Sequence, residues 1–259
     1  LGPGGDTMMN YTRVELDTLL AKYAPKGWQM SFHVNGDVGL DIVLDAYEEA
    51  LINNKLMGTD HRWRVEHCGG CRGDQFQRAV DMGVTISLGP FQFIYWGDLL
   101  DGTMFPPDLG SQWMRWGDAV KAGAHISFHN DGPVSPPIPL LNIQTAITRT
   151  TSTGQVHGAN QIISIDDALK AETLGAAYML HRDDEIGSLA VGKLADLVEL
   201  SMDPYHAEPT TLATQVKVEG TWSGGRKVDL GAFLKQVQAV EAAHTHPVDH
   251  KAVVSAHSC

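Results

Sequence analysis

Residues 28–54 read WQMSFHVNGDVGLDIVLDAYEEALINN, and this stretch decides the fold class. Its first six residues, Trp28–His33, form a short β-rich run, which predicts a strand. From Gly36 to Asn54, apolar residues recur at the spacing of one helix face, which predicts an amphipathic helix. A strand followed directly by such a helix is the start of a βαβ unit. The stretch therefore predicts an α/β fold with parallel strands.

The same alternation continues along the chain. Further strands are predicted at 62–67 (RWRVEH), 84–88 (VTISL) and 125–129 (HISFH), and further helices at 75–82, 112–122, 139–151 and 164–180. Residues 89–110 are rich in Gly, Pro and aromatic side chains and are predicted to be a long loop. Only four βα units can be counted, whereas a complete eight-unit barrel normally needs about 250 residues.

The pattern changes after Leu180. Residues 195–201 and 215–222 alternate between apolar and polar side chains, as strands of a small β appendage do. From residue 241 the chain is rich in Ala, His and Val without a clear period. We therefore divide it into an α/β part at 1–185, a β part at 186–235 and a loose tail at 236–259.

Composition excludes several classes of function. The 259 residues are 43% hydrophobic and 19% charged, as in soluble globular proteins. With 19 Lys and Arg against 31 Asp and Glu, the net charge of −12 argues against nucleic acid as a partner. No apolar run is long enough to cross a membrane, and no export signal is visible, which favours the cytoplasm. Three cysteines are too few for a disulfide scaffold.

Three of the predicted strands are followed or terminated by side chains that can bind metal. They are His33 in HVNGD, His67 in RVEHC and Asp131 in SFHNDGPV. In a parallel α/β barrel such strand ends converge on one site. Imidazole and carboxylate groups are suitable ligands for zinc and similar divalent ions. The pattern therefore predicts a metal site formed by these three residues.

Other residues are candidates for supporting roles at this site. Asp37 lies in the first turn of the helix after His33, where it either caps the helix or supports that histidine. His129 lies two residues before Asp131, so both side chains can face the site. Cys68 and Cys71 form a single C-x-x-C pair, which suits neither a structural zinc site nor a redox motif. We expect Cys68 to line the pocket.

The long loop at 89–110 carries a group of aromatic side chains. Phe91, Phe93, Tyr95 and Trp96 are predicted to lie over the active face and to form the wall of the substrate pocket. They would favour a small-molecule substrate with an apolar or aromatic group. The alternative is that these side chains form a local core against Trp113 and Trp116. Both interpretations remain open at the level of the sequence.

Together these segments resemble the amidohydrolase superfamily, in particular its amidohydrolase-3 or YtcJ-like branch. The matching pieces are HVNGD with its helix, RVEHC, MGVTISLGP, SFHNDGPV and IGSLAVGKLADLVEL at 186–200. The resemblance covers residues 11–228. It implies strands 5–8 of a TIM (β/α)8 barrel, followed by part of a small β-sandwich. It also implies a metal-dependent hydrolase that cleaves carbon–nitrogen bonds other than peptide bonds, such as an amide, N-formyl or cyclic amide bond.

The resemblance implies roles for the site residues as well. His33 and His67 match the metal-binding histidines after strands 5 and 6. Asp131 matches the aspartate after strand 8, which binds metal or accepts the proton of the attacking water. The implied cofactor is a divalent metal, with zinc favoured, as one or two ions in the intact enzyme.

The sequence also departs from the family pattern. Members carry an H-x-H pair after strand 1 and a lysine after strand 4, and neither precedes His33. The only H-x-H, His244-Thr245-His246, lies in the predicted tail and is not expected to bind the catalytic metal. We therefore expect the chain to be a fragment that lacks the first half of the barrel. Its open strand edges would favour association, so a homo-oligomer is left open.

Two other functions remain as alternatives. The chain could be an inactive fragment or scaffold of the same fold. It could also be a metal-independent TIM-barrel enzyme that uses His33 and His67 as acid and base.

Overall fold

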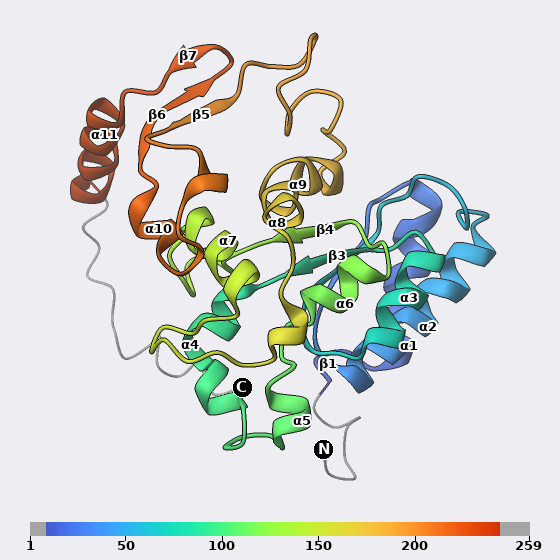
Figure 1. Cartoon of the computed structure of the whole chain (residues 1–259). Coiled ribbons are helices and arrows are strands. Elements are labelled where there is room, and N and C mark those ends of the chain that lie inside the picture. The colour runs from blue at the N-terminus through green and yellow to red at the C-terminus, as the bar shows by residue number, and fades with distance from the viewer. Residues whose placement is uncertain (1–8, 244–259) are drawn as a thin grey trace.

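A computed structural model describes residues 9–243 of the chain, with side chains placed up to residue 239. Four parallel strands form the central sheet in the order β1-β2-β3-β4 (Figure 1). They are β1 (Ser31–Gly36), β2 (Arg64–Gly70), β3 (Thr85–Leu88) and β4 (Ile126–Phe128). The α/β class, the parallel sheet and the order of the strands are as predicted from the sequence.

Helices connect the strands and cover the sheet. They are α1 (Arg13–Tyr23), α2 (Asp37–Asn53), α3 (Gly73–Asp81), α4 (Pro90–Leu100), α5 (Pro107–Gly110), α6 (Trp116–Lys121), α7 (Pro139–Thr148), α8 (Ile165–Glu172) and α9 (Leu174–Met179). Helix α2 packs on β1 and β2, α3 on β3, and α6 on β4. Figure 1 shows α1, α2 and α3 side by side at one end of the sheet.

The register of the strands separates an apolar row from a polar row. Phe32, Val65, Ile86 and Ile126 lie side by side across the sheet, and all but the half-buried Phe32 are buried. The next row is His33, Glu66, Ser87 and Ser127. Because successive side chains of a strand point to opposite faces, the apolar row packs under the helices and the polar row faces the other side.

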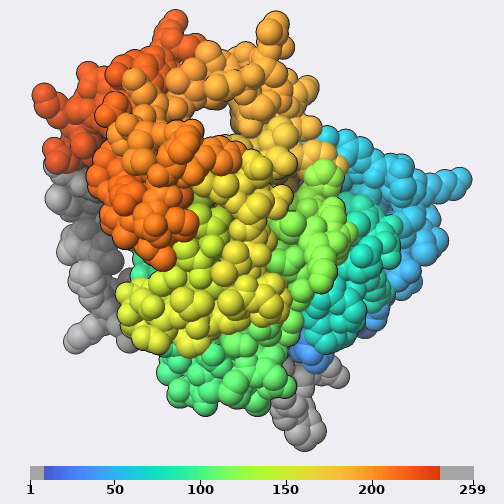
Figure 2. Space-filling view, viewed as in Figure 1, coloured from blue at the N-terminus to red at the C-terminus, as the bar shows by residue number. Residues whose placement is uncertain are grey.

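A second sheet follows the α/β part. It is antiparallel and three-stranded, with β5 (Leu197–Leu200), β6 (Val218–Ser223) and β7 (Arg226–Lys227) in that order. The short helix α10 (Leu212–Gln215) contacts α7, and Figure 2 shows the two segments, orange and yellow-green, in contact on the surface. Helix α11 (Leu230–Ala243) then continues into the part predicted to be a tail from residue 236.

Two predictions about local structure are wrong. The predicted loop at 89–110 contains α4 and α5. Pro90 occupies the first helical turn, where it is well tolerated, and burial of Phe91 and Phe93 overrides the modest helix propensity of aromatic residues. The predicted helix at 164–180 is broken at Thr173, because Gly175 approaches β4 so closely that a Cβ there would fall 2.2 Å from the carbonyl oxygen of Ile126.

Other predicted boundaries shift by a few residues. The helix predicted at 112–122 begins only at Trp116, and the one predicted at 139–151 ends at Thr148. It ends there because Arg149 adopts a left-handed backbone with φ 56°. No helix in the described part of the chain is long and apolar enough to span a membrane.

Candidate active site

Two of the predicted site histidines meet at adjacent strands. His33 lies in β1 and His67 in β2, and their ring centroids are 4.5 Å apart with the planes inclined by 66°. The ring of His67 is 5% exposed, whereas His33 is exposed. The sequence pattern thus identified a pair of imidazoles that the fold brings into contact.

The backbone at His67 is unusual. His67 follows Glu66 directly, so in a regular strand the two side chains would point to opposite faces. Instead, His67 and Cys68 have left-handed φ values of 71° and 55°. Such values are uncommon for residues other than glycine and cost free energy. These φ values interrupt the alternation of side chains between the two faces, so the side chains of both Glu66 and His67 can lie on the polar face of the sheet.

A third imidazole joins the pair. His129 follows β4, and its main-chain N–H donates to the carbonyl oxygen of Leu88 at 3.0 Å. Its ring lies 4.6 Å from that of His67 and 6.0 Å from that of Phe91. The Nε2 atom of His129 is buried and has no hydrogen-bond partner among the described residues. His129, proposed from the sequence only as a supporting residue, therefore belongs to the centre of the cluster.

Burial keeps the rings of His67 and His129 neutral. Desolvation, followed by the nearby His129 and His33, lowers the pKa of His67 to about 4. Desolvation also lowers the pKa of His129. Neutral imidazole is the form that binds zinc, so His67 and His129 have the protonation state of metal ligands at pH 7.

Asp131 lies in the turn after β4. Its backbone is left-handed with φ 50°, its carbonyl oxygen accepts from the N–H of Val134 at 2.7 Å, and the residue is exposed. Burial lowers the pKa values of His67 and His129, and the negative charge of Asp131 acts in the opposite direction on both.

The donor types at the cluster fit a zinc-like ion, because imidazole and carboxylate are its usual ligands and one imidazole nitrogen is unpaired. Between residues 9 and 243, however, no group of three or more His, Cys, Asp or Glu side chains is arranged so that it could hold a metal ion. The ligand set His33, His67 and Asp131 therefore stays a prediction.

Polar side chains continue the row of the sheet that contains His33. Glu66 accepts hydrogen bonds from Ser31 Oγ at 2.8 Å and from Arg64 Nε. Burial would raise the pKa of Glu66, but the charge of Arg64 and the hydrogen bonds of Ser31 and Ser87 outweigh it and hold the pKa below its ordinary value. Glu66 is therefore an ionised carboxylate, paired with Arg64, in the same row of the sheet as His33.

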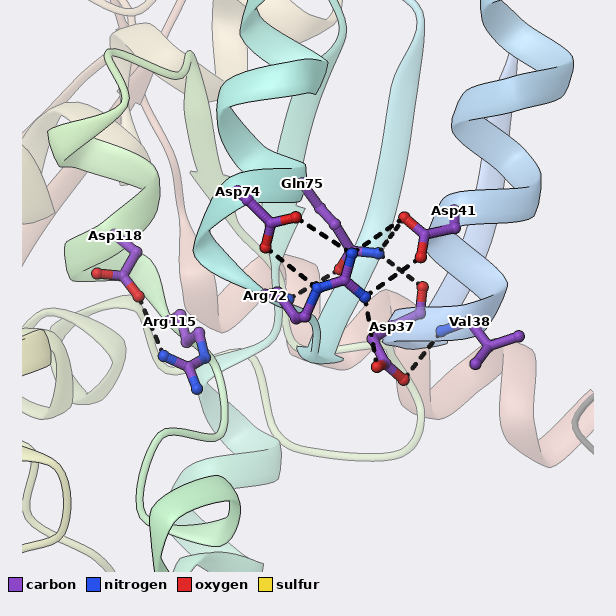
Figure 3. Close-up of polar contacts among 8 residues, drawn as sticks. All are labelled: Asp37, Val38, Asp41, Arg72, Asp74, Gln75, Arg115 and Asp118. Atoms are coloured by element: carbon purple, nitrogen blue, oxygen red, sulfur yellow. Dashed lines mark hydrogen bonds and ion pairs between the residues drawn. The ribbon is translucent and has the colours of Figure 1, made fainter. Parts of the chain in front are cut away.

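Asp37 does not support His33. It is the first residue of α2, and its carboxylate points to the guanidinium of Arg72 at 3.4 Å, as Figure 3 shows. Arg72 also contacts Asp41 and Asp74, so it ties the start of α2 to the start of α3. Asp37 is not the capping residue either, because the N-cap is Gly36, which has no side chain. Its role is to hold two βα connections together.

Cys68 does not line a pocket. It is fully buried in the hydrophobic core together with Cys71, and both are free thiols. A hydrogen bond with Cys71 and burial raise the pKa of Cys68 well above its ordinary value. The left-handed backbone at Cys68 turns its side chain toward the core, which the motif alone does not reveal.

The four aromatic candidates lie on α4 and divide into two groups. Phe93 is fully buried, edge-on to Trp116 and under the guanidinium of Arg149, so it belongs to the core. Phe91 is also buried, but its ring contacts His67, His129 and Trp96 at centroid distances of 6.0–6.5 Å. Tyr95 and Trp96 are about half exposed. Of these four, only Phe91 therefore contacts His67 and His129, and Trp96 contacts Phe91.

Two contributing residues were not identified from the sequence. Gln92 Nε2 lies 3.4 Å from His67 Nδ1, and Trp113 Nε1 donates to Gln92 Oε1 at 3.0 Å. Both side chains are buried. Gln92 stands within the aromatic run of α4, and no motif marks it. The His244-Thr245-His246 segment lies outside the described residues.

Comparison with known proteins is consistent with this geometry. A family model described as the amidohydrolase family matches residues 5–229. The chain is 27% identical over 194 residues to an N-substituted formamide deformylase of Arthrobacter pascens, with 75% of the chain and 35% of that protein covered. It is 27% identical over 207 residues to the amidohydrolase YtcJ of Bacillus subtilis (strain 168), covering 76% and 37%.

A solved structure shows the same relationship. An uncharacterised metal-dependent hydrolase of Pyrococcus horikoshii OT3 matches with a TM-score of 0.64 and 28% identity, over 77% of this chain and 39% of that one. The chain thus spans 35–39% of the length of these three proteins.

Proposed function

Because the chain belongs to the amidohydrolase family, we propose that its strand-end histidines form part of the active site of a metal-dependent hydrolase. This hydrolase would cleave carbon–nitrogen bonds other than peptide bonds. The observation that carries this proposal is the contact of the His67 ring with the rings of His33 and His129, the latter two residues before Asp131 in the chain. In parallel α/β enzymes the carboxyl ends of the strands are where active sites form. The metal-dependent relative of P. horikoshii supports a divalent metal at this position.

In this proposal β1–β4 correspond to strands 5–8 of a TIM barrel, and the β5–β7 sheet to part of a β-sandwich. Support comes from the all-parallel order of β1–β4 and from the polar row on the face away from the helices. Such a row would face the interior of a barrel. The share of each relative that the chain covers, 35–39%, is also what half a barrel with part of a second domain would give.

His33 and His67 would hold the metal, with Asp131 as a further ligand or as the base. A zinc-like ion bound there would lower the pKa of its water and polarise the scissile carbonyl. Zinc is usually four-coordinate, so a complete site needs donors beyond these two histidines. His129, with its unpaired Nε2, is the further candidate within the chain.

The residues of the chain would handle the proton and the substrate. The Asp131 carboxylate would accept the proton from the attacking water and deliver it to the leaving nitrogen. The half-buried, ionised Glu66 would favour positive charge beside it in the row of the sheet that it shares with His33. The half-exposed Trp96, which packs on the buried Phe91, would offer an apolar surface near the histidines.

This surface suggests the class of substrate. We propose a small amide, N-formyl or cyclic amide that carries an apolar or aromatic group. The relative from A. pascens is named for N-substituted formamides, which supports testing that class first. Stacking on Trp96 would select for aromatic substituents over small alkyl ones.

A second candidate is metal-independent acid–base catalysis by His33 and His67. It is favoured by the lack, in the described range, of a group of three ligands that could hold a metal ion. The two candidates differ in whether activity depends on added metal.

The test combines metal content with hydrolysis. Zinc in the purified protein would be measured by mass spectrometry, and hydrolysis with N-formyl benzylamine and N-formyl methylamine. His33→Ala and His67→Ala are expected to lose both zinc and activity, whereas His206→Ala is the control, since His206 is exposed and remote on the chain. Activity that persists after chelation and is lost only in the two alanine variants would contradict the metal-dependent proposal and favour the second candidate.

A further inference from the structure

Trp113 packs directly over the chain that follows His67. An added Cβ on Gly69 would fall 2.6 Å from the indole ring, and one on Gly70 would fall 2.8 Å from it. The indole also stacks on Phe105 at a centroid distance of 5.1 Å and is 9% exposed. The two glycines therefore allow Trp113 to approach the strand, and its ring is held on both sides.

The indole orients the side chain of Gln92. Trp113 Nε1–H donates to Gln92 Oε1 at 3.0 Å. An indole nitrogen can only donate a hydrogen bond, so the atom of Gln92 that faces it must be the amide oxygen. The amide nitrogen of Gln92 is then the atom that lies 3.4 Å from His67 Nδ1. A primary amide nitrogen only donates, so Nδ1 of His67 must accept and carries no proton.

We propose that Gln92, oriented by Trp113, is a positioning residue that holds the neutral His67 ring in the tautomer protonated on Nε2. Neither Gln92 nor Trp113 touches the reacting atoms. Their hydrogen bonds determine which nitrogen of the buried His67 ring offers a lone pair and which nitrogen carries the hydrogen.

This tautomer has a consequence for metal binding, which rests on the proposed function. Ligation through Nε2 needs the lone pair of that atom, so its proton would have to be lost and Nδ1 protonated. Gln92 would then have to present its oxygen to His67, which breaks its bond with Trp113. Ligation through Nδ1 would displace Gln92 altogether. Metal binding at His67 through either nitrogen would therefore have to break at least one hydrogen bond of the Trp113–Gln92–His67 chain.

The tautomer can be observed directly in the metal-free chain. Two-bond ¹H–¹⁵N correlation spectra at pH 7.5 distinguish the two neutral forms, and the His67 signals are assigned by their loss in His67→Asn. We expect Nε2–H in the parent and Nδ1–H in Gln92→Glu, because a carboxylate can accept from both Trp113 and His67. An Nδ1–H form in the parent, or an unchanged form in Gln92→Glu, would overturn the proposal.

Zinc titration gives a second readout. Gln92→Glu is expected to bind Zn²⁺ about 10-fold more tightly, since a carboxylate behind a histidine ligand favours metal binding by roughly this factor. Trp113→Phe frees the amide to rotate without removing the stack on Phe105, and should also bind Zn²⁺ more tightly. Gln77→Glu, on the exposed face of α3, adds the same charge elsewhere and should bind as the parent does.

The two proposals fail in different ways. If both variants bound Zn²⁺ more weakly than the parent, Gln92 and Trp113 would be structural supports only, and the positioning role would be wrong. If the tautomer changed as expected while Zn²⁺ affinity stayed the same, the positioning role would stand and the assignment of His67 as a metal ligand would fail.

Discussion

The rings of His67 and His129 lie 4.6 Å apart, although β3 separates the strands from which they come. Neighbouring parallel strands are about 4.8 Å apart, so β2 and β4 stand roughly 10 Å from one another. The two side chains therefore lean toward each other across the end of β3. This arrangement brings two neutral imidazole rings together at the end of the sheet. The functional proposal depends on this feature.

Asp131→Asn should abolish hydrolysis while leaving the fold intact. Asparagine keeps the size of the side chain but loses the charge that would bind metal and the basicity that would accept a proton in the proposed reaction. General-base catalysis contributes about 10²–10⁴-fold, so the fall in kcat should be at least about 100-fold. Asp131 is exposed, so the melting temperature should not change. Asp108→Asn, exposed on α5, is the matched control, and an active Asp131→Asn enzyme would disprove the assignment.

Gly69→Ala should destabilise the protein and disturb His67. The new Cβ would fall 2.5 Å from Asn35 Oδ1 and 2.6 Å from Trp113, in a region that is fully packed. Overpacking of this kind costs about 1–3 kcal/mol, measured as the free energy of unfolding in urea. Gly36→Ala is the control, because no atom lies within 4 Å of a Cβ there and its φ is −126°. Equal stability of the two variants would show that the packing around Trp113 is not tight.

Arg149→Met should destabilise the fold strongly. The guanidinium is fully buried between Phe93 and Trp116 and donates to the carbonyl oxygens of Ser111, Trp113, Met114 and His157. Methionine fills similar space but leaves those carbonyls without their donors, at a cost of at least about 2 kcal/mol. Arg182→Met, which breaks only an exposed pair with Glu185, should change the free energy of unfolding by about 0.5 kcal/mol or less. Comparable losses in both variants would refute the role of Arg149.

Glu172 should make stability fall as the pH rises. Burial raises the pKa of Glu172 to about 7, although Asn142 Nδ2 donates to its carboxylate at 2.8 Å. Between the ordinary pKa near 4.5 and this value, the folded state binds more protons than the unfolded state, so this residue lowers stability across that interval. Above pH 7 its penalty is constant.

Glu172→Gln removes this contribution. The variant should therefore gain stability relative to the parent between pH 5 and pH 8, as measured by urea unfolding at both values. The exposed Glu219→Gln serves as the control. Comparing each variant with the parent cancels the opposite trend from His67, whose lowered pKa makes stability rise with pH over about 4 to 6.5. A difference between Glu172→Gln and the parent that does not vary with pH would contradict the prediction.

Most of the sheet could be predicted from the sequence. The strands ending near His33 and His67, and the helices after them, carry their own periodicity, because a side chain's burial depends mainly on its position along a helix or strand. The convergence of His33, His67 and the turn with Asp131 followed from the rule that parallel strands present their carboxyl ends on one side. These are consequences of local pattern and chain direction alone.

The tertiary structure decided what surrounds those residues. The local pattern does not mark the left-handed backbone at His67 and Cys68 or the helix at 90–100. The Trp113–Gln92–His67 contacts join residues more than 20 positions apart in the chain. Asp37 and Cys68 were assigned to the site because they stand near its histidines in the sequence, but their side chains turn to Arg72 and Cys71. A local pattern specifies which face a residue occupies, whereas the packing of distant segments determines what its side chain meets there.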